Sequence, residues 1–360
     1  MSGSGQTLLK AQALLDQLQA EGELLREQWR FLLENRSQEI EEEVFRRARA
    51  VRDRVYGRRI FIRGLIEFTN YCRQNCYYCG IRGGNSRASR YRLTKEQILS
   101  CCEAGYGLGF RTFVLQGGED PYFTDQRMVE LICSIKERYP DCALTLSIGE
   151  RPRESYAAFR KAGADRYLLR HETANMAHYA KLHPESQRLE NRMECLKNLK
   201  ELGFQTGAGC MVGSPGQTED CLIDDLEYLT ALQPEMAGIG PFIPHHDTPF
   251  KNEPSGSVEL TLYLLGLVRL LLPAVLLPAT TALGTAAKDG REMGVMAGAN
   301  VVMPNLSPEN VREKYLLYDN KIHTGMEAAE CLEELRASMA AMGYEVAADR
   351  GDFRGNQEFR

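Results

Sequence analysis

A repeated alternation of apolar strands and helical segments is the feature that most limits how this chain can fold. Segments rich in β-branched and apolar residues are predicted strands, and they run over Ile60–Thr69, Arg111–Gln116, Ala143–Ile148, Arg166–His171, Thr206–Val212, Met236–Ile243, Leu276–Thr281 and Asn300–Pro304. Segments with helical spacing lie between them, near Lys95–Gly105, Asp125–Arg138, Glu154–Ala162, Arg188–Leu202, Asp220–Leu232, Leu260–Leu271 and Arg291–Ala297. Strands that alternate with helices are expected to pair in parallel, because a parallel connection needs a long crossover.

Eight such units predict an α/β fold, a (β/α)8 TIM barrel, and its span is close to the ~250 residues typical of one. An open doubly wound sheet is the alternative, but the Gly-rich turn that usually follows its first strand is missing. Leucines at helical spacing in residues 7–52 predict an N-terminal helical extension over 1–55. We expect the barrel over 56–310 and a C-terminal loop and helical tail over 311–360, with a helix at Glu327–Met342.

Composition excludes several classes of protein. The chain is 43% hydrophobic with a net charge of −5, which is typical of a packed globular protein and not of a disordered chain or a nucleic-acid binder. The most apolar window, Leu262–Ala279, contains Arg269, Pro273 and Pro278, so it predicts a buried helix followed by a loop and strand and no membrane span. The start of the chain does not resemble a signal peptide, and a cytoplasmic location is expected.

Cysteine usage carries the strongest chemical signal. Eleven cysteines without a secretory signal favour metal or cluster ligation over disulfides. Cys72, Cys76 and Cys79 form a C-x3-C-x2-C motif just after the first predicted strand. Three thiolates are too few for a closed structural zinc site, whereas they suit a 4Fe–4S cluster with one open iron. Unrelated or zinc-binding cysteines are the alternative. Seven further cysteines have no ligand spacing and are expected to be buried, namely Cys101, Cys102, Cys133, Cys142, Cys195, Cys210 and Cys221.

This motif resembles the signature of the radical S-adenosylmethionine (radical SAM) enzymes. In that superfamily the cysteines follow the first barrel strand, and an aromatic residue, here Tyr78, precedes the third. A GGE-like element ends the second strand and holds the methionine amino group of S-adenosylmethionine. Here the sequence QGGED stands at that position, and it contains Gln116, Gly117, Gly118 and Glu119.

From about Phe61 to Tyr318 the chain resembles one branch of the superfamily, the radical SAM maturases of iron-only (FeFe) hydrogenase. The matching stretches include IEFTNYCRQNCYYCGIR, VLQGGEDPY, DRYLLRHETAN, TGAGCMVGSPGQT, GIGPFIPHHDTPF and ANVVMPNLSP. Methylornithine synthase and biotin synthase are relatives of this branch. The resemblance implies one 4Fe–4S cluster and S-adenosyl-L-methionine as cofactors.

Further site residues follow from chemistry beside the resemblance. Glu172 suits ribose hydroxyls or a cationic group, and Arg192 suits a carboxylate. The resemblance implies that both contact S-adenosylmethionine, and a surface ion pair is the alternative for each. Arg170, in an apolar predicted strand, needs a partner: a substrate carboxylate, Glu172 or another side chain. His171 is either a hydrogen-bonded core residue or a ligand, and no ligand role rests on His246. The resemblance adds substrate residues, namely Thr145, Thr280, Thr281, Met303, Tyr315 and Tyr318.

The C-terminal tail departs from some members of this branch. They carry a second cluster motif, and the matching positions here are His323, Cys331 and Glu334, so two of the three thiolates are missing. We therefore expect no second cluster, which argues against sulfur insertion of the biotin synthase kind.

The resemblance implies an enzyme that cleaves S-adenosylmethionine reductively and helps to build the diiron subcluster. Its 5′-deoxyadenosyl radical would attack the sulfur of a cysteine-bound Fe(CO)2CN species, a small organometallic substrate. The implied partners are an electron donor and, transiently, the tyrosine-cleaving and scaffold maturases. The alternatives are a mutase resembling methylornithine synthase, a biotin synthase-like enzyme and a non-catalytic iron–sulfur carrier.

Overall fold

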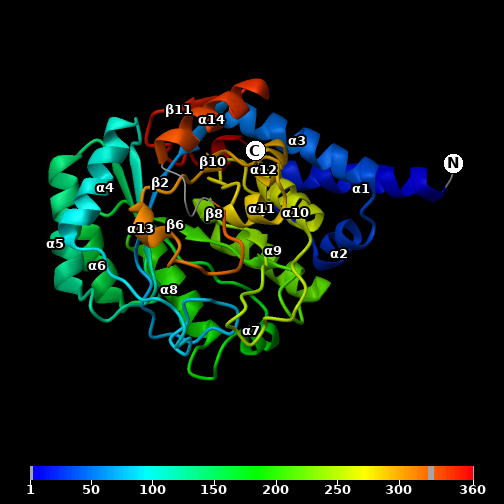
Figure 1. The fold of residues 1–360 in the computed structure, drawn as a ribbon. Coiled ribbons are helices and arrows are strands. Elements are labelled where there is room, and N and C mark those ends of the chain that lie inside the picture. Colours follow the sequence, from blue (N-terminus) through cyan, green and yellow to red (C-terminus); the bar gives the residue numbers. More distant parts are fainter. Residues whose placement is uncertain (1–2, 323–327, 360) are drawn as a thin grey trace.

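The computed structural model describes residues 3–322 and 328–359. The N-terminal region is three helices, α1 (Gly3–Glu21), α2 (Arg26–Glu34) and α3 (Gln38–Tyr56). Helix α1 reaches away from the rest of the molecule, whereas α3 packs against α10 (Val258–Leu271) (Figure 1). Leu15, Leu18 and Trp29 of this region are buried in the main hydrophobic core.

A parallel sheet forms the frame of the protein. Its six strands, in spatial order, are β2 (Gly64–Thr69), β3 (Thr112–Gly117), β4 (Ala143–Ser147), β5 (Arg166–Leu168), β6 (Gln205–Ala208) and β8 (Met236–Ala237). Every neighbouring pair is parallel. The long crossover helices between these strands lie outside the sheet (Figure 1) and are α4 (Lys95–Gly107), α5 (Asp125–Arg138), α6 (Arg153–Ala162), α8 (Leu189–Glu201) and α9 (Glu219–Leu232). These five predicted helices are confirmed to within two residues at each end.

Shorter strands continue the parallel arrangement. Strand β1 (Arg59–Ile62) pairs with β10 (Val301–Val302) and β11 (Glu345–Ala347), and β7 (Met211–Val212) pairs with β9 (Gly240–Pro241). Single parallel bridges join Met236 to Leu276, Pro278 to Val301, and Asn305 to Leu65 in β2. The protein is thus α/β with parallel strands, as predicted. The first predicted strand is divided at Arg63, and the fifth is divided at Gly209 and Cys210.

The predicted strand Leu276–Thr281 is found only in part: Leu276 and Pro278 form single parallel bridges to Met236 and Val301, whereas Thr280 and Thr281 stand at the start of a helix. Pro278 has no N–H to donate, and this segment makes only the two single bridges. Thr280 caps α11 (Thr281–Ala286), and its hydroxyl accepts a hydrogen bond from Leu283 N at 3.4 Å. Sequence periodicity also missed α7 (Met176–Leu182), α13 (Glu309–Arg312) and β11, because such short segments show too few periods to be recognised. The remaining predicted helices correspond to α12 (Gly290–Met296) and α14 (Ala328–Ala341).

The apolar window that includes α10 is a buried helix, as predicted. Arg269 is fully buried in it, and its guanidinium donates to Gly298 O (3.0 Å), Pro273 O (2.9 Å) and Asn300 Oδ1 (2.9 Å). Burial lowers the pKa of this guanidinium to about 9. Among the described residues, no helix is both long and apolar enough to cross a membrane.

Candidate active site

A cavity of about 280 Å³ lies at the carboxyl ends of the parallel strands. Most of the predicted site residues line it, namely Cys72, Cys76, Tyr78, Cys79, Gln116, Gly117, Gly118, Glu119, Arg170, Glu172, Arg192, Tyr315 and Tyr318. The structure therefore places the three cysteines, the GGE element and the predicted ion-binding side chains around one space. Parallel strands explain this convergence, because their carboxyl ends meet on the same side of the sheet.

The loop that carries the three cysteines is fixed by Arg90. This guanidinium donates to the carbonyl oxygens of Asn70 (2.5 Å), Ile81 (2.8 Å), Arg82 (2.7 Å) and Asn85 (3.0 Å). Four backbone acceptors on one side chain hold the loop in shape without regular secondary structure. No sequence motif marks Arg90 for this role.

The glycines of the GGE element allow the strand β3 to approach this loop. A Cβ atom on Gly118 would lie 2.2 Å from Tyr71 O and 2.6 Å from Cys72 Cβ. Glu119 follows, and its backbone N donates to Cys72 Sγ at 3.4 Å. Its carboxylate accepts from Arg73 Nε at 3.0 Å and from Gln74 Nε2 at 2.7 Å. The side chain of Glu119 is thus bound to the cysteine loop.

The three thiols are free and partly buried. Burial raises the pKa of Cys76 to about 11, raises that of Cys72, and raises that of Cys79 well above its ordinary value. A bound metal ion reverses this effect, because a coordinating thiol is deprotonated by the charge of the metal. Among the described residues that line the cavity, no further cysteine or histidine offers a fourth ligand.

Arg170 and Glu172 face the cavity from the segment after β5. Arg170 NH2 lies 3.0 Å from Glu172 Oε2, but the angles do not form a hydrogen bond. Nε and NH2 of Arg170 and Oε2 of Glu172 consequently have no hydrogen-bond partner within the described part of the chain. Such groups are ready to bind a ligand. Glu172 also has a φ of 68°, which is rare for a residue other than glycine.

Arg192, at the start of α8, is buried and paired. Its Nε lies 2.7 Å from Glu150 Oε1, and its NH1 donates to Arg170 O at 3.3 Å. Glu150 also accepts from Asn191 Nδ2 and follows β4. Sequence reasoning did not single out Glu150, although a carboxylate just after a predicted strand end was a signal for it.

Aromatic and polar side chains complete the wall. Tyr78 Oη lies 3.2 Å from His183 Nε2, and the rings meet edge to face. Burial raises the pKa of Tyr315 well above its ordinary value. The lining residues that the sequence did not single out are Gln74, Ile81, Ser147, Gly149, Leu168, Leu169, Gln187, Met211, Pro241, Phe242, Ile243, Ala282 and Leu317. Most of them lie in loops or are apolar, so no motif marks them.

Four predicted substrate residues do not line the cavity. Thr145 is buried in β4, and its hydroxyl has no hydrogen-bond partner among the described residues. Thr280 and Thr281 begin α11. Met303 packs against the apolar cluster that includes Tyr56. Their part in substrate binding stays a prediction.

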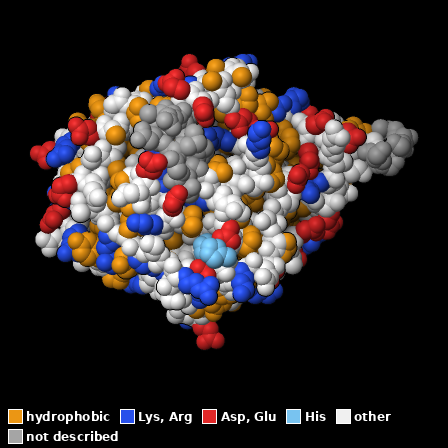
Figure 2. Space-filling model, in the orientation of Figure 1, with side chains coloured by type: hydrophobic (Ala, Val, Ile, Leu, Met, Phe, Trp, Pro, Cys, Tyr) orange, Lys and Arg blue, Asp and Glu red, His pale blue; other side chains and the backbone are white. Residues whose placement is uncertain are grey.

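Two adjacent histidines, His245 and His246, differ in their surroundings near the cysteine loop. A Cβ on Gly80 would lie 2.3 Å from the buried His245 ring, so this ring packs on the loop. His246 is exposed, and its Nδ1 lies 2.6 Å from Asp319 Oδ1 while its Nε2 lies 3.3 Å from Asp247 Oδ2. Figure 2 shows histidine surface on this face between acidic and basic side chains. Carboxylates already occupy both ring nitrogens of His246.

The remaining cysteine predictions have mixed outcomes. Six of the seven predicted as buried are buried, but Cys133 is exposed, because it lies off the buried face of α5 formed by Met128, Leu131, Ile132 and Ile135. Three positions match the second cluster motif of other branch members. Of these, His323 and the side chain of Cys331 lie outside the described residues, and Glu334 is exposed.

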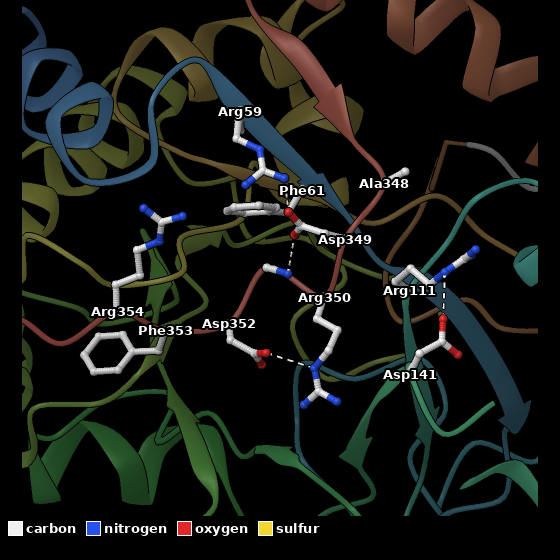
Figure 3. A pocket seen from close by; sticks show the side chains of 11 residues that line it. Arg59, Phe61, Arg111, Asp141, Ala348, Asp349, Arg350, Asp352, Phe353 and Arg354 are labelled. Atoms are coloured by element: carbon white, nitrogen blue, oxygen red, sulfur yellow. Dashed lines mark hydrogen bonds and ion pairs between the residues drawn. The ribbon is translucent and has the colours of Figure 1, made fainter. Parts of the chain in front are cut away.

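A second cavity, of about 450 Å³, lies at the opposite, amino-terminal side of the strands (Figure 3). Its arginines are engaged by protein acceptors: Arg59 binds Asp349, Arg111 binds Asp141, and Arg350 binds Asp352 (Figure 3). Arg354 donates to Val55 O at 2.9 Å. Because its cations are already paired, this cavity has no feature of a ligand site.

A family model described as the radical SAM superfamily matches residues 66–229. The fold and the three-cysteine cavity are those of this superfamily. The FeFe hydrogenase maturase subunit HydE of Thermotoga maritima is 46% identical over 310 residues, which cover 86% of this chain and 88% of that protein. The chain therefore belongs to the HydE family of radical SAM enzymes.

Other relatives share the fold. The 3-methylornithine synthase of Methanosarcina barkeri is 30% identical and covers 81% of this chain and 83% of its own. The crystal structure of methylornithine synthase (PylB) superposes with a TM-score of 0.83 at 29% identity, covering 93% of this chain and 97% of that one. The crystal structure of HydG, a maturase of the FeFe hydrogenase, superposes with a TM-score of 0.79 at 20% identity over 94% of this chain and 76% of that one.

Proposed function

We propose that this enzyme matures FeFe hydrogenase and that its cavity binds one 4Fe–4S cluster, S-adenosylmethionine and an iron–cysteine substrate. The observation that carries the proposal is the presence in one cavity of three free thiols together with Arg170 and Glu172, which form an ion pair at 3.0 Å but no hydrogen bond. The 46% identity with HydE of Thermotoga maritima supports the assignment to hydrogenase maturation.

The three thiols fit a cluster with one open iron. Cys72, Cys76 and Cys79 are soft ligands in one wall, and none of the described lining residues provides a fourth thiol or imidazole. When bound there, a reduced cluster supplies the electron that cleaves the C5′–S bond of S-adenosylmethionine to methionine and a 5′-deoxyadenosyl radical.

The protein's own residues bind and orient the reactants. We infer that the GGE segment and Glu172 hold the amino and ribose groups of S-adenosylmethionine, and that Arg192 is held ready for its carboxylate. Arg170 would bind an anionic group of the substrate. Tyr315, Tyr318 and Leu317 cover the cavity and help to exclude water from the radical.

The substrate class proposed is a cysteine-bound iron species carrying CO and cyanide, and its sulfur would receive the radical. The tyrosine-cleaving maturase would supply this species, the scaffold maturase would receive the product, and a separate donor would deliver the electron. The bridges at Leu276, Pro278 and Asn305 are proposed to complete a (β/α)8 barrel around the cavity, because they join the ends of the six-stranded sheet through two further segments.

Anaerobic reconstitution tests this function. The reduced protein should release 5′-deoxyadenosine and methionine, and an iron–cysteine complex with CO and cyanide should change the rate or the adenosyl product. A Cys72→Ser, Cys76→Ser or Cys79→Ser change should remove both cluster and cleavage. Full cleavage in any of these variants would contradict that ligand assignment.

A mutase of the methylornithine synthase kind is the second candidate. It is favoured by the fold similarity over 97% of that enzyme's structure. Formation of methylornithine by the reconstituted protein, without any response to iron–cysteine complexes, would favour this candidate over maturation.

A further inference from the structure

The segment Arg170–Asn175 makes a strained turn at the edge of the cavity. Glu172, with its φ of 68°, is one of three described residues other than glycine with a positive φ. Such a conformation is unfavourable and persists only where surrounding contacts impose it. Glu172 N donates to Gly209 O at 3.0 Å, and Met211 N donates to Glu172 O at 3.2 Å. Both bonds join Glu172 to the segment 209–211, so they hold its backbone from that segment alone.

His171 supplies a further constraint on this turn. Its ring is fully buried and does not line the cavity, unlike the side chains of Arg170 and Glu172 on either side of it in the sequence. Nδ1 accepts a hydrogen bond from Gly209 N at 3.2 Å, so in the neutral ring the proton is on Nε2. Nε2 lies 3.2 Å from Asp225 Oδ1. Each nitrogen of His171 thus joins the turn to another element.

Asp225, on α9, contacts both ends of the turn. It is buried, and its Oδ1 lies near His171 and also accepts from Ala174 N at 2.6 Å. The neighbouring Asp224 accepts from Asn175 Nδ2 at 2.7 Å. The Asp225 carboxylate therefore contacts residues on both sides of Glu172 in the sequence, namely His171 and Ala174.

The same three groups do not make a metal site. Ligand atoms of His171, Cys210 and Asp225 lie within 4.8 Å of one another. However, the Gly209 N–H occupies Nδ1, and this leaves the proton on Nε2, the atom that would have to bind a metal. The geometry favours an electrostatic contact between His171 and Asp225, each of which accepts a hydrogen bond from a backbone N–H, over a metal ligand set.

We propose that His171 and Asp225 are positioning residues that hold the left-handed turn at Glu172, and thereby place Glu172 and Arg170 at the cavity. This inference rests on the proposed function, in which these two side chains bind S-adenosylmethionine and substrate. His171 and Asp225 touch neither ligand. They act through the backbone of the turn. This backbone cannot keep its strained geometry when the hydrogen bonds from Gly209 N to His171 Nδ1 and from Ala174 N to Asp225 Oδ1 are both removed.

Steady-state cleavage of S-adenosylmethionine by the iron-loaded, dithionite-reduced enzyme tests the proposal. In His171→Ala, the KM for S-adenosylmethionine should rise about tenfold or more, equivalent to ~1.4 kcal/mol of binding. The iron content should stay normal, and kcat should change far less than KM. The double variant with Asp225→Asn should bind no more weakly than the poorer single variant, because both changes break one unit.

Two conservative variants guard against loss of folding. His171→Asn keeps an acceptor near the position of Nδ1, and His171→Gln keeps a donor near the position of Nε2, so each should rescue part of the KM. The matched control is Asn300→Ala, since Asn300 is equally buried but its Oδ1 accepts from Arg269 (2.9 Å) and from Leu277 N (2.9 Å), outside the turn. It should lower the melting temperature without raising KM.

An unchanged KM in folded, iron-loaded His171→Ala would overturn the positioning role, and so would an equal rise in the Asn300→Ala control. If His171→Ala does not fold, unchanged KM values in both His171→Asn and His171→Gln overturn it instead. A wild-type enzyme that releases no 5′-deoxyadenosine contradicts the proposed function itself, which separates the two failures.

Discussion

At the scale of single residues, the cavity combines groups that are satisfied by the protein with groups that are not. Both carboxylate oxygens of Glu119 accept hydrogen bonds from the protein, whereas Arg170 and Glu172 form an ion pair at 3.0 Å without a hydrogen bond. Since buried polar atoms normally have partners, the unpaired ones mark where ligands bind.

Arg170→Met tests this reading. Its partner Glu172 lies at a partly exposed cavity wall, so the loss of the pair should cost the apo protein about 1 kcal/mol or less. Turnover that depends on the iron–cysteine substrate should fall strongly, while S-adenosylmethionine still binds. Thermal melts and substrate-dependent assays check both parts. A large fall in melting temperature, or normal turnover at low substrate, would contradict a substrate role.

How far single residues could be predicted depended on whether their signal was local. The spacing of Cys72, Cys76 and Cys79 lies within eight residues, so the sequence alone marks it. Arg90 acts through backbone carbonyl groups of the cysteine loop, and no pattern near it reveals this, whereas Glu150 was marked only by its place just after a predicted strand. The Arg170 alternatives also needed the structure, because only coordinates show that Glu172 lies 3.0 Å away.

At the scale of elements, the backbone at the end of β3 approaches the backbone of the cysteine loop too closely for any side chain at Gly118. Gly118→Ala would place a methyl group 2.2 Å from Tyr71 O, which is backbone and cannot move aside cheaply. We expect a loss of about 1–3 kcal/mol of stability together with poor retention of iron. Chemical denaturation and iron content after gel filtration measure the two effects.

The matched control is Gly107→Ala, at the end of α4. No atom lies within 4 Å of its added Cβ, and alanine favours helix, so stability should stay equal or rise by up to about 1 kcal/mol. Equal behaviour of the two variants would show that the close approach at Gly118 does not matter.

Elements were predicted where their periodicity was long. Helices α4 to α6, α8 and α9 each span ten residues or more, so their apolar spacing shows clearly. The predicted strand at Leu276–Thr281 is shorter than expected, because Thr280 caps α11 and Thr281 begins it, and apolar content alone does not reveal where the helix starts. Strand β11 was missed because its pairing with β1 joins residues far apart in the sequence.

At the scale of the whole molecule, the C-terminal segment joins the amino-terminal side of the strands. Buried Arg166 donates to Arg350 O (2.7 Å) and to Asp352 Oδ1 (2.7 Å). Burial alone would raise the pKa of Asp352, but the charge of Arg166 and hydrogen bonds from Gln205 and Arg350 hold it below its usual range.

This depressed pKa predicts a pH dependence. An unfolded Asp titrates near ~3.9, so Asp352 stabilises the fold above that pH and loses its contribution as the pH falls through the lower folded value. Asp352→Asn should therefore lower the melting temperature at pH 7, and the difference from wild type should shrink as the pH approaches 3. A difference that stays constant over this range would contradict the assignment.

Iron content tests the expected number of clusters. Reconstituted protein should bind about four irons, and Cys331→Ser should leave this content and the activity unchanged, since two thiolates of a second motif are missing. A loss of about half of the iron in this variant would show that other residues complete a second cluster.

The central claim is that this cavity performs reductive cleavage of S-adenosylmethionine in the service of hydrogenase maturation. The most direct measurement quantifies 5′-deoxyadenosine and methionine from the reduced, iron-loaded protein, with and without an iron–cysteine complex carrying CO and cyanide. Without the complex we predict equimolar amounts of the two products. With the complex we predict less 5′-deoxyadenosine than methionine, because the adenosyl group then ends on the substrate sulfur. A protein that carries about four irons yet releases neither product would contradict the account, because it would then be an iron–sulfur carrier and not an enzyme.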